Sequence, residues 1–277
     1  MLHPWSGKAS RGIAGLCILL AASGLFLAPQ PARADAPEST IAFVAVTDAD
    51  LERFGTFPFD RKILAQVVHR VRAAQARAIV LKFFFNEDQA SDHLLAAEAQ
   101  ALPTYFQMGL HGVRERPSDG RLEGVAEQPN KTLLPSAAGT GFVNERTSQG
   151  DRIELEAYAD GVHVKSLSLL GAELASGHRA EIGSGQLRLG QRAFPIDPKG
   201  RALCPYAKAA MPTPISFSGI LDAQSPLTER LRGKVVVIGY LAKDTPRISL
   251  GPGRSIPIHE AYVRQVACLS QAPAKED

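Results

Sequence analysis

The chain has 277 residues, of which 45% are hydrophobic and 21% are charged, as in a typical soluble globular protein with ample core. The formal net charge of +3 comes from residues 1–34, which contain Lys8, Arg11 and Arg33 and no acidic residue. The rest of the chain is neutral, which argues against a nucleic-acid partner because such partners select strongly basic surfaces.

The N-terminal segment has the features of a secretory signal peptide over residues 1–34. Basic Lys8 and Arg11 precede an apolar stretch at 13–27, and Ala32-Arg33-Ala34 matches an A-x-A cleavage site. The apolar stretch is shorter than the roughly 20 residues that a membrane span needs. We therefore expect a periplasmic or secreted protein, with a linker at 35–40. The alternative is an uncleaved segment that anchors the chain in the inner membrane and makes its only membrane contact.

Residues 41–85 predict a strand, a helix and a second strand. The apolar run 41–46 indicates the first strand, and Asp60 can cap a helix whose apolar residues recur at helical spacing. The second strand, 78–85, is almost continuously apolar, which is typical of a parallel sheet buried on both faces. The two strands and the helix predict a right-handed βαβ unit, followed by a polar loop at 86–91.

The remaining segments complete a single α/β domain over residues 41–269. Residues 234–239 form a second buried strand, 112–136 are polar and predict a flexible insertion, and 270–277 predict a disordered tail. The other expected elements are a helix capped by Ser91, strands at 104–110, 138–144 and 201–206, hairpins turning at Asp160-Gly161 and Gly190, helices at 166–175, 216–221, 226–231 and 259–269, and a loop at 250–256. We expect a central, largely parallel sheet with helices on both faces and inserted antiparallel hairpins.

Cys204 and Cys268 are the two cysteines that follow the signal-like segment. In an oxidising compartment they can form a disulfide bond. Two buried thiols are the alternative, because the sequence does not supply the Cα separation that decides between them.

The sequence contains no recognisable catalytic motif. It lacks a phosphate-binding Gly-x-x-x-x-Gly-Lys-Ser/Thr loop and a Gly-x-Ser-x-Gly nucleophile turn, and its histidines lack the paired spacing of a zinc site. We therefore expect a protein that is not an enzyme and that has no catalytic residues, no metal and no cofactor.

Six residues are candidates for ligand binding. Asp48, Asp88 and Asp244 follow buried strands and would converge if those strands were neighbours in a parallel sheet. They would then hold a cation or polar ligand; otherwise they are only acids in polar loops. The other three candidates are Arg61, Lys82 and His259.

Each of these three also has a simpler structural interpretation. Arg61 follows an aromatic pair and can stack on it. Lys82 interrupts an apolar strand, so it must pair with an acid, reach water along its stem or lie on an edge strand. His259 opens the closing helix, where a structural role is the alternative to ligand binding.

Several segments in this order resemble the second CHASE-type extracellular sensory domain (CHASE2), an input module of bacterial membrane receptors. The resemblance spans residues 41–269. It rests on Val44-Ala45-Val46-Thr47-Asp48, Phe57-Pro58-Phe59-Asp60-Arg61, residues 78–85, Gly141-Phe142-Val143-Asn144, Pro195-Ile196-Asp197, Tyr206, Ser216-Phe217, residues 233–239 and His259.

The chain also departs from the family pattern. Family members usually have an acidic pair at Thr47-Asp48 and an Asp at Lys82, so a ligand site shared with the family is in doubt. Most family receptors continue into membrane spans and a cytoplasmic output domain, whereas this sequence stops at Asp277. The resemblance implies a sensory module that binds a small ligand or a membrane receptor partner and acts through that partner. The alternatives are a small periplasmic metal-dependent hydrolase and a purely structural envelope interaction protein.

Overall fold

The computed structural model describes residues 39–143, 150–183, 185–222 and 227–271. The predicted signal peptide, most of the linker and most of the C-terminal tail lie outside the described residues. Within them, no helix is both long and apolar enough to cross a membrane.

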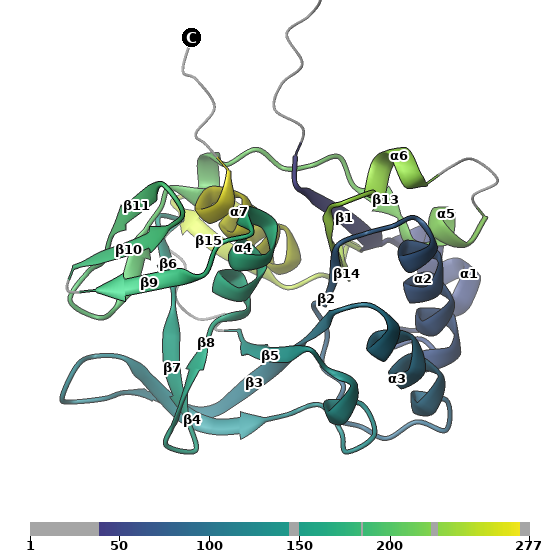
Figure 1. Cartoon of the computed structure of the whole chain (residues 1–277), viewed down its shortest axis with the longest axis horizontal. Coiled ribbons are helices and arrows are strands. Elements are labelled where there is room, and N and C mark those ends of the chain that lie inside the picture. Colours follow the sequence, from purple (N-terminus) through teal and green to yellow (C-terminus); the bar gives the residue numbers. More distant parts are fainter. Residues whose placement is uncertain (1–38, 144–149, 184, 223–226, 272–277) are drawn as a thin grey trace, which may run out of the picture. The chain divides into compact units, whose positions relative to one another are not determined.

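A nine-stranded sheet organises the described residues (Figure 1). Its central strands β13, β1, β14, β2 and β3 are all parallel, and β5 adds in parallel to β3. Antiparallel pairing joins β3 to β4 and β7 to β8. In sheet order the strands are β13 (Ile215–Ser216), β1 (Ile41–Val46), β14 (Val235–Tyr240), β2 (Ala78–Leu81), β3 (Thr104–Glu115), β4 (Leu122–Glu127), β7 (Glu156–Ala159) and β8 (Val162–Lys165), with β5 (Gly139–Phe142) off this path. The predicted, largely parallel α/β sheet is confirmed.

Helices cover both faces of the parallel strands, because successive strand side chains point to opposite faces. On one face Val44, Ile79 and Ile238 belong to a core with α2 and α3. On the other face Phe43 and Val237 belong to a core with α4 and α7. The helices are α1 (Asp48–Phe54), α2 (Arg61–Ala73), α3 (Asp92–Ala101), α4 (Leu167–Ser176), α5 (Phe217–Asp222), α6 (Thr228–Leu231) and α7 (Ile258–Ser270), with short 3-10 turns η1 (Leu134–Ser136) and η2 (Tyr206–Lys208).

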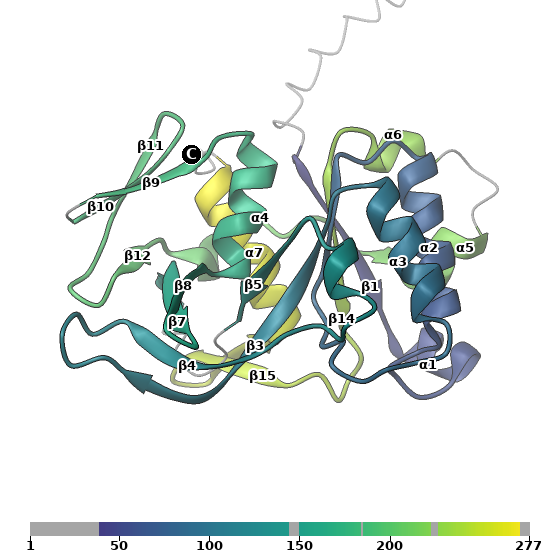
Figure 2. The ribbon, with the colours of Figure 1, turned by 60° about the horizontal axis from the view of Figure 1, so that its bottom comes forward.

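Small antiparallel sheets pack around α4 and α7 (Figure 2). They are β9 (Ala180–Gly183) with β10 (Gln186–Leu189) and β11 (Arg192–Pro195), β6 (Arg152–Glu154) with β12 (Arg201–Leu203), and β15 (Arg247–Gly251) with β16 (Arg254–Pro257). Cys204 and Cys268 form a disulfide bond with a Cα–Cα distance of 6.2 Å. The bond ties the segment after β12 to α7, so of the two alternatives left open by the sequence, the structure has the disulfide.

Three local expectations need correction. Part of the expected insertion at 112–136 is regular structure, because residues 122–127 pair as β4 with the extended β3. The expected loop at 250–256 lies mostly in the β15–β16 hairpin. The expected second strand, 78–85, ends at Leu81, so Lys82 follows the strand and does not interrupt it. After β1 the chain enters α1 directly: the Asp50 carboxylate accepts a hydrogen bond from the Thr47 amide at 2.7 Å and so caps the first turn.

Candidate functional site

Four of the six candidate residues lie at one end of the parallel sheet. β14 lies between β1 and β2, and Val46 pairs with Tyr240 at the carboxyl ends of their strands. Asp48 follows β1, Lys82 follows β2 and Asp244 follows β14, while His259 lies in the first turn of α7. We call Asp48, Lys82, Tyr240, Asp244 and His259 the strand-end cluster. Ligands of open α/β sheets commonly bind at this edge.

Tyr240 lies beside Asp244 and within the electrostatic influence of Asp48. Its hydroxyl donates a hydrogen bond of 2.8 Å to the Asp244 carboxylate. Burial, that hydrogen bond and the negative charges of Asp244 and Asp48 raise the pKa of Tyr240 to about 12. The Lys243 amide approaches both Asp48 carboxylate oxygens at 3.3 Å, which holds the segment after β14 beside the start of α1.

Lys82 and Tyr240 are the buried members of the cluster, and His259 beside them is partly buried. Lys82 is 2% exposed, and β2 has β14 on one side and β3 on the other, so the edge-strand explanation of Lys82 is wrong. Burial, and then the charge of Lys82, lower the pKa of His259 well below its ordinary 6.5, so the imidazole is neutral near pH 7. Its Nδ1 atom has no hydrogen-bond partner among the described residues.

Aromatic rings pack around these polar groups. The Phe57 ring centroid lies 4.6 Å from that of Phe83 and 5.5 Å from that of Tyr240. The imidazole of His259 lies 5.8 Å from the Phe83 ring. The strand-end cluster is therefore a close-packed junction of strands and helices at the carboxyl edge of the sheet.

Arg61 and Asp88 lie elsewhere. Arg61 is 1% exposed, donates from Nε to the Asp92 carboxylate at 3.1 Å, and stacks on Phe85 with its guanidinium carbon 4.6 Å from the ring centroid. Arg61 therefore has a structural role, but it stacks on Phe85 and not on the aromatic pair that precedes it in the sequence. Asp88 is on the surface, 4.0 Å from Lys131.

The expected convergence of three acids is not seen. No group of three or more His, Cys, Asp or Glu residues in the described segments is placed to hold a metal ion. Asp244 accepts from Tyr240 and Asp48 from the Lys243 amide, whereas Asp88 lies in the polar loop between β2 and α3, close to Lys131.

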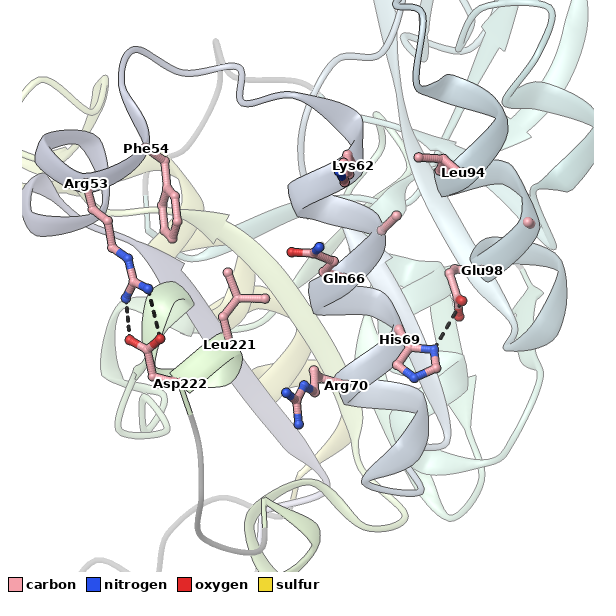
Figure 3. Close-up of a pocket in the computed structure, with 12 residues that line it drawn as sticks. Arg53, Phe54, Lys62, Gln66, His69, Arg70, Leu94, Glu98, Leu221 and Asp222 are labelled. Atoms are coloured by element: carbon pink, nitrogen blue, oxygen red, sulfur yellow. Dashed lines mark hydrogen bonds and ion pairs between the residues drawn. The ribbon is translucent and has the colours of Figure 1, made fainter.

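A groove of about 700 Å³ crosses the helical face formed by α1, α2, α3 and α5 (Figure 3). Gln66 and Arg70 project from α2 toward Leu221 on α5, while His69 projects toward Glu98 on α3, 3.1 Å away (Figure 3). An ion pair between Arg53 on α1 and Asp222 on α5 closes one wall. The volume lies within the roughly 300–1,000 Å³ range of small-molecule sites.

A buried carboxylate joins two of the elements that form the groove. Asp50 is fully buried and accepts hydrogen bonds from the Thr47 amide at 2.7 Å and, through its other oxygen, from the Ser218 amide at 2.8 Å. Thr47 precedes α1 and Ser218 lies in α5. Asp50 therefore fixes the α1 wall, with Arg53 and Phe54, against the α5 wall, with Leu221 and Asp222.

The sequence contained only half of the signal for this groove. The amphipathic pattern of α2 shows its polar side, which contains Lys62, Gln66, His69 and Arg70. The simplest interpretation of such a side is a face exposed to solvent. The opposing wall comes from Arg53 and Asp222, which are 169 residues apart, and Asp50 gave no signal because an acid one turn after a strand is ordinary.

Comparisons with known proteins give one match. The model of the CHASE2 domain family matches residues 18–270, which is most of the chain. No curated protein and no solved structure matches.

Proposed function

Because the chain belongs to the CHASE2 domain family, whose members are extracellular sensory modules, we propose that it is an extracytoplasmic sensor that acts by binding a small ligand. On this proposal the chain is exported to the periplasm or secreted, or held at the inner membrane by its N-terminal segment. It passes its signal to a membrane receptor partner and carries out no reaction itself.

The groove on the helical face is the observation that supports ligand binding. It combines a large enough volume with mixed chemistry: Phe54 and Leu221 offer apolar surface, Gln66 offers an amide, and Arg70 makes no ion pair with any described residue. A few polar groups on a partly apolar wall are what orient a small ligand. The close-packed strand-end cluster is the second candidate position.

Binding is favoured over metal-dependent hydrolysis because the hydrolase alternative needs Asp48, Asp88 and Asp244 together. Asp88 does not join the other two in a metal-holding group within the described segments. A titration of the full chain with Mg²⁺, Ca²⁺, Mn²⁺ and Zn²⁺ tests that alternative directly. Saturable binding that Asp48→Ala abolishes would favour the hydrolase.

A groove-filling substitution tests the ligand-binding proposal. Native mass spectrometry of the full chain after incubation with an envelope extract should show a retained small molecule. Gln66→Trp should lose it, because the indole occupies the space between α2 and Leu221 (Figure 3). Gln100→Trp is the matched control, since Gln100 is an exposed glutamine on α3 that does not line the groove. Equal retention by all three proteins would exclude the groove as the site.

A further inference from the structure

A second pocket, of about 490 Å³, lies at the opposite edge of the sheet from the strand-end cluster. Arg77 lies just before β2, Tyr105 at the start of β3 and Gly139 at the start of β5, so these residues belong to the amino ends of three parallel strands. The remaining wall comes from Lys165 at the end of β8 and from the side of α4 and the residues after it: Leu170, Glu173, Leu174, Gly177, His178 and Arg179. The pocket therefore uses none of the groups assigned above.

The charges of this pocket are unbalanced. Lys165 donates to the Glu173 carboxylate at 2.7 Å, and the same oxygen accepts the Ala180 amide at 2.7 Å, so these two side chains neutralise each other. Arg77 and Arg179 also line the pocket, and neither side chain makes a hydrogen bond or ion pair with a described residue. Two guanidinium groups are thus left to attract an anion.

The helix terminus explains the position of Arg77 but not its free donors. A cation is favoured beside the last turn of a helix, and an added Cβ at Gly177, the left-handed cap of α4, would lie 3.0 Å from Nη2 of Arg77. The guanidinium therefore lies close to Gly177, where a side chain would collide with it. Its N–H groups stay available, and a guanidinium presents them as a planar fork that matches a carboxylate.

Apolar side chains lie beside the arginines. Tyr105, Leu170 and Leu174 line the same pocket, and Tyr105 is packed against Gly139, where an added Cβ would lie 3.0 Å from the ring. An inorganic anion would leave this surface unused. An organic acid would place its carboxylate at the arginines and its apolar body on Tyr105 and the leucines.

We propose that this pocket binds an amphipathic organic acid, an aromatic or aliphatic carboxylate held by Arg77 and Arg179. The pocket shares no residue with the groove on the helical face, so the two binding proposals are independent. Binding of an organic acid here also does not require that the chain is a sensor. Two sites on opposite parts of the fold would let the chain respond to two ligands.

Isothermal titration of the full chain with 3-phenylpropionate at constant ionic strength tests the proposal. The wild type should bind saturably, and Arg77→Gln and Arg179→Gln should each weaken binding at least tenfold. The affinity of Arg77→Lys should lie between that of the wild type and that of Arg77→Gln, because lysine keeps the positive charge and loses the planar pair of N–H donors. Arg232→Gln is the matched control, because Arg232 is an exposed arginine that lines neither the groove nor this pocket, and it should bind as the wild type does.

Three results would overturn the proposal. They are the absence of saturable binding by the wild type, unchanged affinity in Arg77→Gln and Arg179→Gln, and tighter binding of inorganic phosphate than of 3-phenylpropionate in the same titration. Both arginines are exposed, so thermal unfolding of the variants should match the wild type and separate lost binding from lost folding.

Discussion

A buried ion pair shows how single residues position the helical face. Asp92 accepts from Arg61 Nε, from the Gln89 amide at 2.7 Å and from the Asn130 side-chain amide at 2.8 Å. It thereby joins the first turn of α2 to the first turn of α3 and to the segment before η1. Burial lowers the pKa of Arg61, and the charge of Asp92 opposes that shift.

Removing one partner of this pair should be strongly destabilising. Arg61→Met leaves the Asp92 carboxylate buried without its cation, and we expect a loss of about 3–5 kcal/mol in the free energy of unfolding. Arg53→Met, which breaks the exposed pair with Asp222, should change stability far less, because water screens that pair. Urea unfolding of both variants measures the contrast, and equal losses would contradict the structural role of Arg61.

His259 should make stability depend on pH. The folded state holds it neutral, with a pKa well below 6.5, beside Lys82, Tyr240 and Phe83. Below pH 6.5 the unfolded chain takes up a proton that the folded chain does not, so stability present above this pH is lost as the pH falls. The slope is at most about 1.4 kcal/mol per pH unit.

His259→Phe isolates this effect, because it keeps a ring in the aromatic packing and removes the titrating group. Unfolding free energies measured between pH 7.5 and pH 5 should fall more steeply for the wild type than for the variant. Parallel curves would contradict this account, because they would show that His259 takes up a proton as readily in the folded protein as in the unfolded chain.

At the scale of elements, burial on both faces decides what the sequence can predict. β1 and β14 are buried at every position, so each is a continuous apolar run in the sequence. Such a run can be predicted as a strand without knowing which strands it pairs with. β4, β15 and β16 are partly exposed, and their sequences resemble loops until their partners are known. The ends of β1 and β14, and hence the positions of Asp48 and Asp244, follow from the first kind of strand, whereas the end of β2 before Lys82 does not, because the apolar run continues to Phe85. The groove does not, because its walls meet only in the folded chain.

The disulfide should stabilise α7 and the small sheets. Cys204 and Cys268 are 64 residues apart, and for a loop of this length the chain-entropy model gives about 4 kcal/mol. We expect Cys204→Ala with Cys268→Ala to lower the free energy of unfolding by about that amount, as measured by denaturant titration. Thiol labelling of the denatured, unreduced wild type should find both cysteines blocked, and labelling of both would contradict the bond.

At the scale of the whole molecule, the family match extends over the described fold, whereas the resemblance points to a difference at Lys82. A CHASE2 domain is expected to be an extracellular input module, and the match over residues 18–270 covers the whole described α/β fold. Lys82 occupies a position where the family resemblance implies an acid, and it is buried beside a neutral His259. We therefore expect ligand chemistry in this chain to differ from that of relatives with an acid at this position.

The most direct test of the sensory assignment is affinity capture of the tagged full chain, expressed with its own N-terminal segment, from solubilised membranes. We predict that the chain is found outside the cytoplasm and enriches a membrane receptor with a cytoplasmic output domain. Gln100→Trp should leave that enrichment unchanged, and Gln66→Trp should alter it, because on our proposal the groove binds the ligand whose signal the chain passes to its partner. A chain confined to the cytoplasm, or an identical capture profile for Gln66→Trp and the wild type, would contradict the account.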